Sequence, residues 1–325
     1  MIRRQGAEDG GQSLGCRNAA CPEQLRGKAA TNTQSLVFRP RSPDGFTLVE
    51  MIVVIVITGI IGGMVAMFIR APMQGYVDSA RRAAMTDIAD TALRRMSRDL
   101  RLALPNSVRV TTNTCPSGAG TCRFLEFLPT RGGGRYRGSA PGNELNFSNP
   151  ADNSFDVLVP VGVTATANDF LVIYNLGIRS SGACSLLGAD AYQGCNRRPV
   201  VSGGAIVTFT PTALVFPFES PGNRFHVVTR PVTYVCAPVA GGGGTLRRYW
   251  GYTIQDAQPT TAAQLALGGI AANALLASNV GATCNFTYDP IVVAQRYGLV
   301  TMQLTLTDSG ESVTLYNATH VSNEP

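Results

Sequence analysis

The sequence has few of the residues that enzyme active sites and metal centres commonly use. Among 325 residues it has only two histidines, His226 and His320, and a single lysine, Lys28. It has no HExxH segment, and its acidic residues lack the spacing of an EF-hand loop. His226 alternates with apolar residues, which favours a structural histidine over a catalytic base. We therefore expect no catalytic residue, no metal and no cofactor, and a role other than enzyme catalysis.

Nucleotide and nucleic-acid binding also find little support. The glycine run 241–244 is not followed by lysine, so it favours a flexible turn over a phosphate-binding loop. The segment 131–138, RGGGRYRG, has the composition to contact an anion or a nucleic acid, but a solvated loop is the simpler interpretation. The net charge of the whole chain is +6, which is modest for its length. We expect no nucleic-acid partner.

One long apolar run stands out near the amino terminus. Residues 51–69 carry no charge, and as a helix they would span about 28 Å, close to the ~30 Å hydrocarbon core of a bilayer. A buried core helix of a soluble domain is one alternative. A secretory signal peptide is another, but its apolar region would be shorter, roughly 7–15 residues. The run therefore predicts a membrane-spanning helix.

The residues just before this run carry a specific motif. Gly45 to Glu50 read GFTLVE and lead directly into the apolar run. This arrangement resembles the type IV prepilin signal of pilins and type II secretion pseudopilins. The resemblance implies that a membrane-embedded prepilin peptidase cleaves between Gly45 and Phe46 and then N-methylates Phe46. A glycine before the cleaved bond leaves the backbone unobstructed.

Glu50 is the only acidic residue at the start of the apolar run. An acid costs up to ~2.5–3.5 kcal/mol at the centre of a bilayer, so a carboxylate at its edge favours a partner. The resemblance implies that the partner is the α-amine of Phe46 on a neighbouring subunit, which would set the axial register between subunits. The alternative is that Glu50 only reaches to the membrane interface.

The resemblance also divides the chain into parts. Residues 1–45 would be a leader, 46–69 the membrane-spanning half of a helix, 70–105 its amphipathic half, and 106–325 a periplasmic β-rich domain. The leader is long and includes Cys16 and Cys21, so the true translation start could lie nearer Gly45. Arg39 and Arg41 before the span favour a cytoplasmic amino terminus. The protein would then cross the inner membrane once, before entering a pilus or pseudopilus.

Beyond the span, the pattern predicts an amphipathic helix from Tyr76 to Leu104, with Pro72 bending or loosening the helix before it and Pro105 ending it. The predicted charge pairs are Asp78–Arg82, Asp90–Arg94 and Arg95–Asp99. Its predicted apolar stripe is Val77, Ala80, Ala84, Ile88, Ala92, Met96, Leu100 and Ala103.

After Pro105 the sequence changes to short β-patterned runs separated by Gly, Pro and Asn. The clearest hairpin surrounds Asp308 to Gly310. A short helix interrupted by glycines is expected within 262–276. The predicted strands are 107–112, 123–128, 144–147, 155–159, 170–175, 205–210, 214–218, 225–228, 232–236, 246–254, 284–288, 300–307 and 312–317. Together these features predict an α+β fold, in which a long amino-terminal helix packs on a largely antiparallel sheet.

The cysteines agree with export. Two of the eight cysteines precede Gly45, which leaves an even number, six, in the remainder. An even number outside the membrane fits disulfides in an oxidising periplasm. Neighbour pairing is the simplest scheme, although six cysteines allow 15 pairings. It gives Cys115–Cys122, Cys184–Cys195 and Cys236–Cys284. A metal site is the rival, but these spacings do not match CxxC ligand pairs.

Within the pilin-like family, several segments resemble the MshO-type minor pilins of MSHA pili: 89–110, VTYVCAP at 232–238, TLRRYWGYTI at 245–254 and the ending ESVTLYNATHVSNEP. This resemblance implies a subunit that initiates or caps a type IV pilus. Its partners would be the prepilin peptidase, other major and minor pilins and the inner-membrane assembly platform. The alternatives are a minor pseudopilin of type II secretion and, further away, a membrane-anchored periplasmic adhesin or enzyme.

Overall fold

The computed structural model describes residues 45–159, 164–182, 184, 188–292 and 297–325. Of the predicted leader, residues 1–44, which include Cys16, Cys21, Arg39 and Arg41, lie outside the described residues. The chain divides into two compact units, residues 1–62 and 63–325. Within the described residues, the fold is α+β, a long amino-terminal helix followed by a mostly antiparallel β-domain, which confirms the predicted class.

Helix α1 (Leu48–Leu100) begins just after the motif segment and continues through Pro72. At its start, the Glu50 amide donates a hydrogen bond to the Thr47 hydroxyl at 3.2 Å, which satisfies one of the free N–H groups of the first turn. The first part of α1, from Leu48 to Arg70, is exposed along its whole length. It is long and apolar enough to cross a membrane.

In the second unit, α1 buries a narrower stripe than the sequence predicts. The stripe begins at Met85 and consists of Met85, Ala89, Ala92, Leu93, Met96 and Leu100. The earlier predicted positions Val77, Ala80, Ala84 and Ile88 are exposed, so that part of the prediction is wrong. Small and apolar residues recur at helical spacing on two faces of α1. Only contact with the sheet decides which of the two faces is buried.

The helix also ends earlier than predicted, at Leu100. The next residues turn away to pair with the segment that follows strand β2 (Thr121–Phe127). The Leu104 amide donates to the Leu128 carbonyl, and the Thr130 amide donates to the Leu102 carbonyl, both at 2.7 Å. These backbone bonds replace the helical ones before Pro105 is reached.

Two of the three predicted charge pairs on α1 are absent from the described ion pairs. Asp90 and Arg94 do pair, at 2.6 Å. Arg82 instead contacts Glu311, and Asp99 contacts Arg248, so both reach from α1 to the sheet. These pairs are made between distant parts of the chain, which a helical spacing rule does not include.

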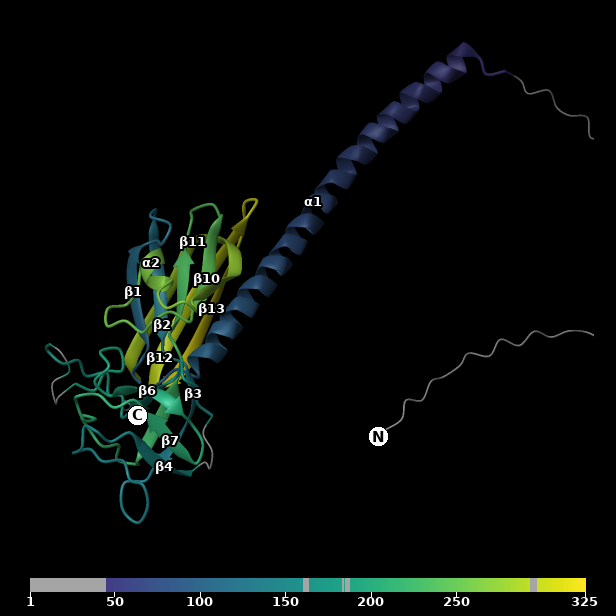
Figure 1. Ribbon diagram of the computed structural model, residues 1–325. Coiled ribbons are helices and arrows are strands. Elements are labelled where there is room, and N and C mark those ends of the chain that lie inside the picture. The colour runs from purple at the N-terminus through teal and green to yellow at the C-terminus, as the bar shows by residue number, and fades with distance from the viewer. Residues whose placement is uncertain (1–44, 160–163, 183, 185–187, 293–296) are drawn as a thin grey trace, which may run out of the picture. The chain divides into compact units, whose positions relative to one another are not determined.

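The seven-stranded sheet covers the buried stripe of α1. Its strand order is β1-β2-β9-β10-β11-β12-β13, and every pair in it is antiparallel. Figure 1 shows the sheet beside the last turns of α1. Apolar side chains of β2, β9, β10, β11 and β12 form one cluster with the helix. Besides β2, the strands are β1 (Arg109–Thr114), β9 (Val232–Ala237), β10 (Gly244–Trp250), β11 (Ala272–Val292), β12 (Tyr297–Asp308) and β13 (Glu311–Ser322).

A second β-assembly is inserted between β2 and β9. It is a closed barrel with the strand order β3-β4-β7-β6-β5-β8, and its core is rich in aromatic rings. Phe155 lies at its centre and contacts Tyr136, Phe209 and Phe225. The strands are β3 (Thr130–Tyr136), β4 (Ser154–Val159), β5 (Phe170–Ile173), β6 (Arg197–Ser202), β7 (Ile206–Phe209) and β8 (Arg224–Val228).

The barrel holds most of the errors in strand prediction. Residues 144–147 and 214–218 are not strands, and β6 was not predicted. The glycine-rich segment expected to be a solvated loop is strand β3. Cβ atoms at Gly133 and Gly134 would lie 2.6 Å from the Phe225 and Val159 carbonyl oxygens, so these glycines allow neighbouring strands to approach closely.

Residues 262–276 combine a short helix with the start of a strand. Helix α2 (Ala262–Leu265) has a capping box between Thr261 and Gln264, and β11 begins at Ala272. The expected turn at 241–244 is present, because Gly241, Gly242 and Gly243 all have positive φ before β10 begins.

Candidate functional site

The motif segment forms a short extended lead into α1. Gly45, Phe46 and Thr47 precede the helix and are exposed, and the Phe46 ring is 81% exposed. A Cβ added at Gly45 would meet no atom within 4 Å. Within the described chain, nothing about packing therefore requires a glycine at position 45.

Glu50 lies in the first turn of α1 and is exposed. No cation of the described residues forms an ion pair with Glu50. By contrast, Asp78, Asp90 and Asp99 of α1 each pair with an arginine. A carboxylate in the first turn benefits from the positive end of the helix dipole, which contributes about 0.3–1 kcal/mol. The rest of its electrostatic stabilisation has to come from outside the described chain.

The apolar residues after Glu50 have no protein cover in the structure. Every residue from Met51 to Ile69 is exposed, and α1 is the only helix of the described residues that is long and apolar enough to span a membrane. This exposure removes the support for the alternative of a buried core helix. An exposed apolar helix of this length requires lipid or other apolar helices around it.

The three neighbour pairs of cysteines are disulfides in the structure. Cys115–Cys122 closes the turn between β1 and β2, and Cys184–Cys195 closes a loop before β6. Cys236–Cys284 joins β9 to β11, two strands that are separated by β10. All three lie in the second unit, beyond the apolar run. No group of three or more His, Cys, Asp or Glu side chains within the described ranges is arranged to hold a metal ion.

A buried charged cluster at β2 has no signal in the sequence. Glu126 is fully buried, and its carboxylate accepts hydrogen bonds from Arg109 at 2.7 Å and from the Tyr252 hydroxyl at 2.8 Å. The Arg109 guanidinium lies 3.6 Å from the centroid of the Tyr192 ring. Burial raises the pKa of Glu126, although Arg109 and Tyr252 oppose the change. These contacts satisfy the Glu126 carboxylate and join the segments that carry Tyr192 and Tyr252 to the sheet.

His226 lies in the barrel strand β8, as its alternation with apolar residues predicts. Its Nε2 atom is buried and has no hydrogen-bond partner within the described ranges. Burial, together with the nearby Arg224, lowers the pKa of His226 to about 4. A half-buried imidazole with a lowered pKa is consistent with the structural role expected from the sequence.

Comparison with protein families connects this geometry to a known class. The family model for the prokaryotic N-terminal methylation motif matches residues 41–66, which include Gly45, Phe46, Glu50 and most of the apolar run. Neither the curated proteins nor the solved structures include a match to the chain. The matched motif supports a type IV pilin-like or pseudopilin protein. It implies processing by a prepilin peptidase and assembly with other pilins and, with the apolar helix, membrane anchoring.

Proposed function

We propose that this chain is a minor pilin, a structural and non-catalytic subunit that initiates or caps assembly of an MSHA-like type IV pilus. One observation carries the proposal. An exposed Gly45–Phe46 bond directly precedes an exposed apolar helix, and the only carboxylate at the start of that helix has no cationic partner in the described chain. A subunit that is cut at Gly45 and then packs against other subunits would use all three features.

The mature subunit would begin with N-methylated Phe46 and cross the inner membrane once, with residues 106–325 in the periplasm. The three disulfides support that location, because such bridges persist in oxidising compartments. The partners would be major and other minor pilins and the inner-membrane assembly platform. The size of the β-region, a sheet with an inserted barrel, supports a minor subunit over a small, repeated major one.

Processing is tested by mass spectrometry of the mature amino terminus. Wild-type protein should begin with a methylated Phe46, and Gly45→Leu should leave only precursor. Gly59→Leu is the matched control, because a Cβ at Gly59 also meets no atom within 4 Å and the change keeps the helix apolar. A mature chain that begins elsewhere, or normal cleavage of Gly45→Leu, would contradict the proposal.

Assembly is tested at Glu50. Glu50→Val makes the span more apolar, so membrane insertion should persist while incorporation into filaments falls. Glu50→Asp keeps the charge on a shorter side chain and should be intermediate. The control is Asp87→Val, which removes an exposed acid of α1 beyond the membrane span. Filament counts and co-purification of other pilins are measured at equal amounts of mature protein. Equal assembly of Glu50→Val and wild type would reduce Glu50 to an interfacial residue.

A minor pseudopilin of type II secretion would carry the same motif. Deletion of the gene separates the two, because a pilus subunit is needed for surface filaments and a pseudopilin for release of secreted enzymes. Loss of secretion with intact piliation would replace the pilus assignment. It would leave the processing prediction at Gly45 unaffected.

A further inference from the structure

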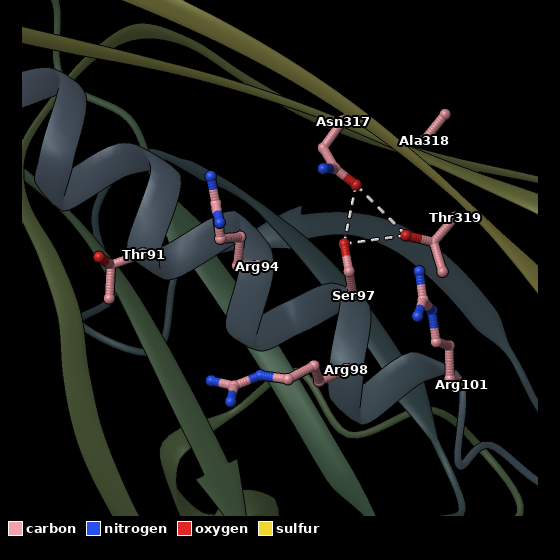
Figure 2. A pocket seen from close by; sticks show the side chains of 8 residues that line it. All are labelled: Thr91, Arg94, Ser97, Arg98, Arg101, Asn317, Ala318 and Thr319. Atoms are coloured by element: carbon pink, nitrogen blue, oxygen red, sulfur yellow. Dashed lines mark hydrogen bonds between the residues drawn. The ribbon is translucent and has the colours of Figure 1, made fainter.

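A groove runs between the last turns of α1 and the sheet-edge strand β13. Its volume is about 540 Å³, and both walls belong to the second unit. The helix contributes Thr91, Arg94, Ser97 and Arg98, Arg101 follows the helix end, and the strand contributes Asn317, Ala318 and Thr319 (Figure 2).

Hydrogen bonds fix the base of this groove. The Ser97 hydroxyl donates to the Asn317 side-chain oxygen at 2.7 Å, and the Thr319 hydroxyl donates to Ser97 at 2.9 Å. Ser97 is 8% exposed and Thr319 is 4% exposed. Figure 2 shows Arg94 and Arg101 on either side of this polar contact. These hydrogen bonds hold the helix and the strand together, so the groove between them is a fixed feature of the second unit.

The groove has an excess of positive charge. Arg94 pairs with Asp90, and the Arg94 side chain is 73% exposed. Arg98 and Arg101 are exposed, and neither forms an ion pair with any acid in the described ranges. Asp99 lies between them in sequence, but it is turned to the sheet, where it pairs with Arg248. Two arginines thus stand beside the groove without a counter-charge.

The strand side of the groove is a sheet edge. β13 is the last strand of the sheet and pairs only with β12 among the described strands. The groove is lined by three consecutive residues of β13, of which Asn317 and Thr319 face α1 and Ala318 faces the other side. Consecutive residues alternate between the two faces of a strand, so it is the edge of β13 that borders the groove. An edge strand offers unpaired backbone N–H and C=O groups to another strand.

We propose that this groove binds an extended acidic segment of another protein, which adds to the edge of β13 and places carboxylates against Arg94, Arg98 and Arg101. The spacing fits: Arg94 and Arg98 are about 6 Å apart along the helix axis, and alternate residues of a strand are about 6.8 Å apart. The segment would carry acids at positions i and i+2. Its backbone supplies the strand pairing and its acids supply the specificity.

The other sources of negative charge fit less well. The chain has no two acidic residues at i and i+2, so a second copy does not supply this segment. A lipid headgroup is remote, since Arg98 lies about 40 Å along the helix beyond Ile69, the end of the apolar run. That the natural donor is another subunit of the same filament rests on the proposed function. Binding of the segment does not, so the two can fail separately.

The test uses the full chain in a non-ionic detergent and fluorescence polarisation of three labelled peptides. TVDVDVT carries the spaced acids, TVNVNVT replaces them with amides, and TVVDDVT makes them adjacent. The charge-reversal variant is Arg98→Glu with Arg101→Glu. The control variant is Arg95→Glu with Arg135→Glu, which makes the same change in net charge at two exposed arginines outside the groove.

The expected result is that TVDVDVT binds best, that added salt weakens it, and that the groove variant binds it about tenfold or more weakly. The control variant should bind like wild type. N-methylation of alternate amides of TVDVDVT should abolish binding in one register and not in the other. Equal binding of TVVDDVT, loss in both variants, full displacement by inorganic phosphate or stronger binding of a dT15 oligonucleotide would each overturn the proposal.

Discussion

Acidification should destabilise the barrel through one residue, His226. The imidazole lies on β8 between β3 and β5, opposite Gly133 on one side and Val172 on the other. Its Nε2 atom is enclosed and has no hydrogen-bond partner among the described residues, so an added proton would introduce an unpaired charge near Arg224. The folded state therefore resists protonation, whereas the unfolded chain accepts the proton freely.

The size and direction follow from the two pKa values. Burial lowers the pKa of His226 from 6.5 to about 4. Above pH 6.5 both states are neutral and the full stability is present. Between pH 6.5 and 4 only the unfolded state gains the proton, so stability falls as the pH falls. At pH 5 the loss is up to about 2 kcal/mol, because each pH unit contributes about 1.4 kcal/mol.

The assay is urea unfolding of the full chain in detergent, followed by circular dichroism at pH 7 and pH 5. His226→Gln removes the titrating group and should flatten the pH dependence by up to about 2 kcal/mol relative to wild type. His320→Gln is the control, since that histidine is exposed. The buried Glu126 acts with the opposite sign, because its raised pKa stabilises the fold as pH falls, and it cancels in the comparison.

The reasoning fails if His226→Gln and wild type lose the same stability between pH 7 and pH 5. It also fails if His320→Gln, rather than His226→Gln, flattens the profile. Either result would mean that a proton reaches His226 in the folded barrel at little cost, or that His226 is already solvated.

Three further outcomes are expected from chemical and thermal unfolding. Asp99→Ala should lower the free energy of unfolding by about 2–3 kcal/mol, because Tyr234 and Arg248 both donate to its carboxylate. Asp90→Ala breaks an exposed ion pair and should lower it by under about 1 kcal/mol. Equal losses in the two variants would refute the argument from burial. Replacing the Cys236–Cys284 bridge with alanines should lower the free energy of unfolding by about 4 kcal/mol, and replacing the Cys115–Cys122 bridge should lower it by about 2.5 kcal/mol, since the first bridge closes the longer loop. A larger loss for the Cys115–Cys122 variant would contradict this account. Gly134→Val should lower stability by about 2–3 kcal/mol or prevent folding, because its Cβ would meet the Val159 carbonyl oxygen, and an unchanged melting temperature would show that the strands can separate there.

The features that the sequence predicted well depend on residues close together in the chain. The apolar first part of α1 follows from the length and hydropathy of the run alone. The two short disulfides link cysteines that turn-rich segments keep near one another, and the structure forms both. The hairpin of β12 and β13 follows from alternation around a tight turn at Asp308 to Gly310.

The errors occur where the outcome depends on distant contacts. The predicted stripe on α1 was correct only from Ala92 onward, because the side that is buried is set by the sheet and not by the helical period. RGGGRYRG has the composition of a loop, yet two of its glycines lie opposite backbone carbonyls of β8 and β4, where no Cβ fits.

By itself, the sequence determined the processing motif, the apolar run and the class of fold, since each depends on local composition or on spacing along the chain. The tertiary structure alone decided how the charges are used. Glu126 is buried and pairs with Arg109, while Arg98 and Arg101 stand beside a sheet edge and form no ion pair with an acid in the part of the chain that the structure describes. Whether an arginine is satisfied or free depends on which distant strand folds beside it, and the Coulomb energy between two charges follows their separation in space.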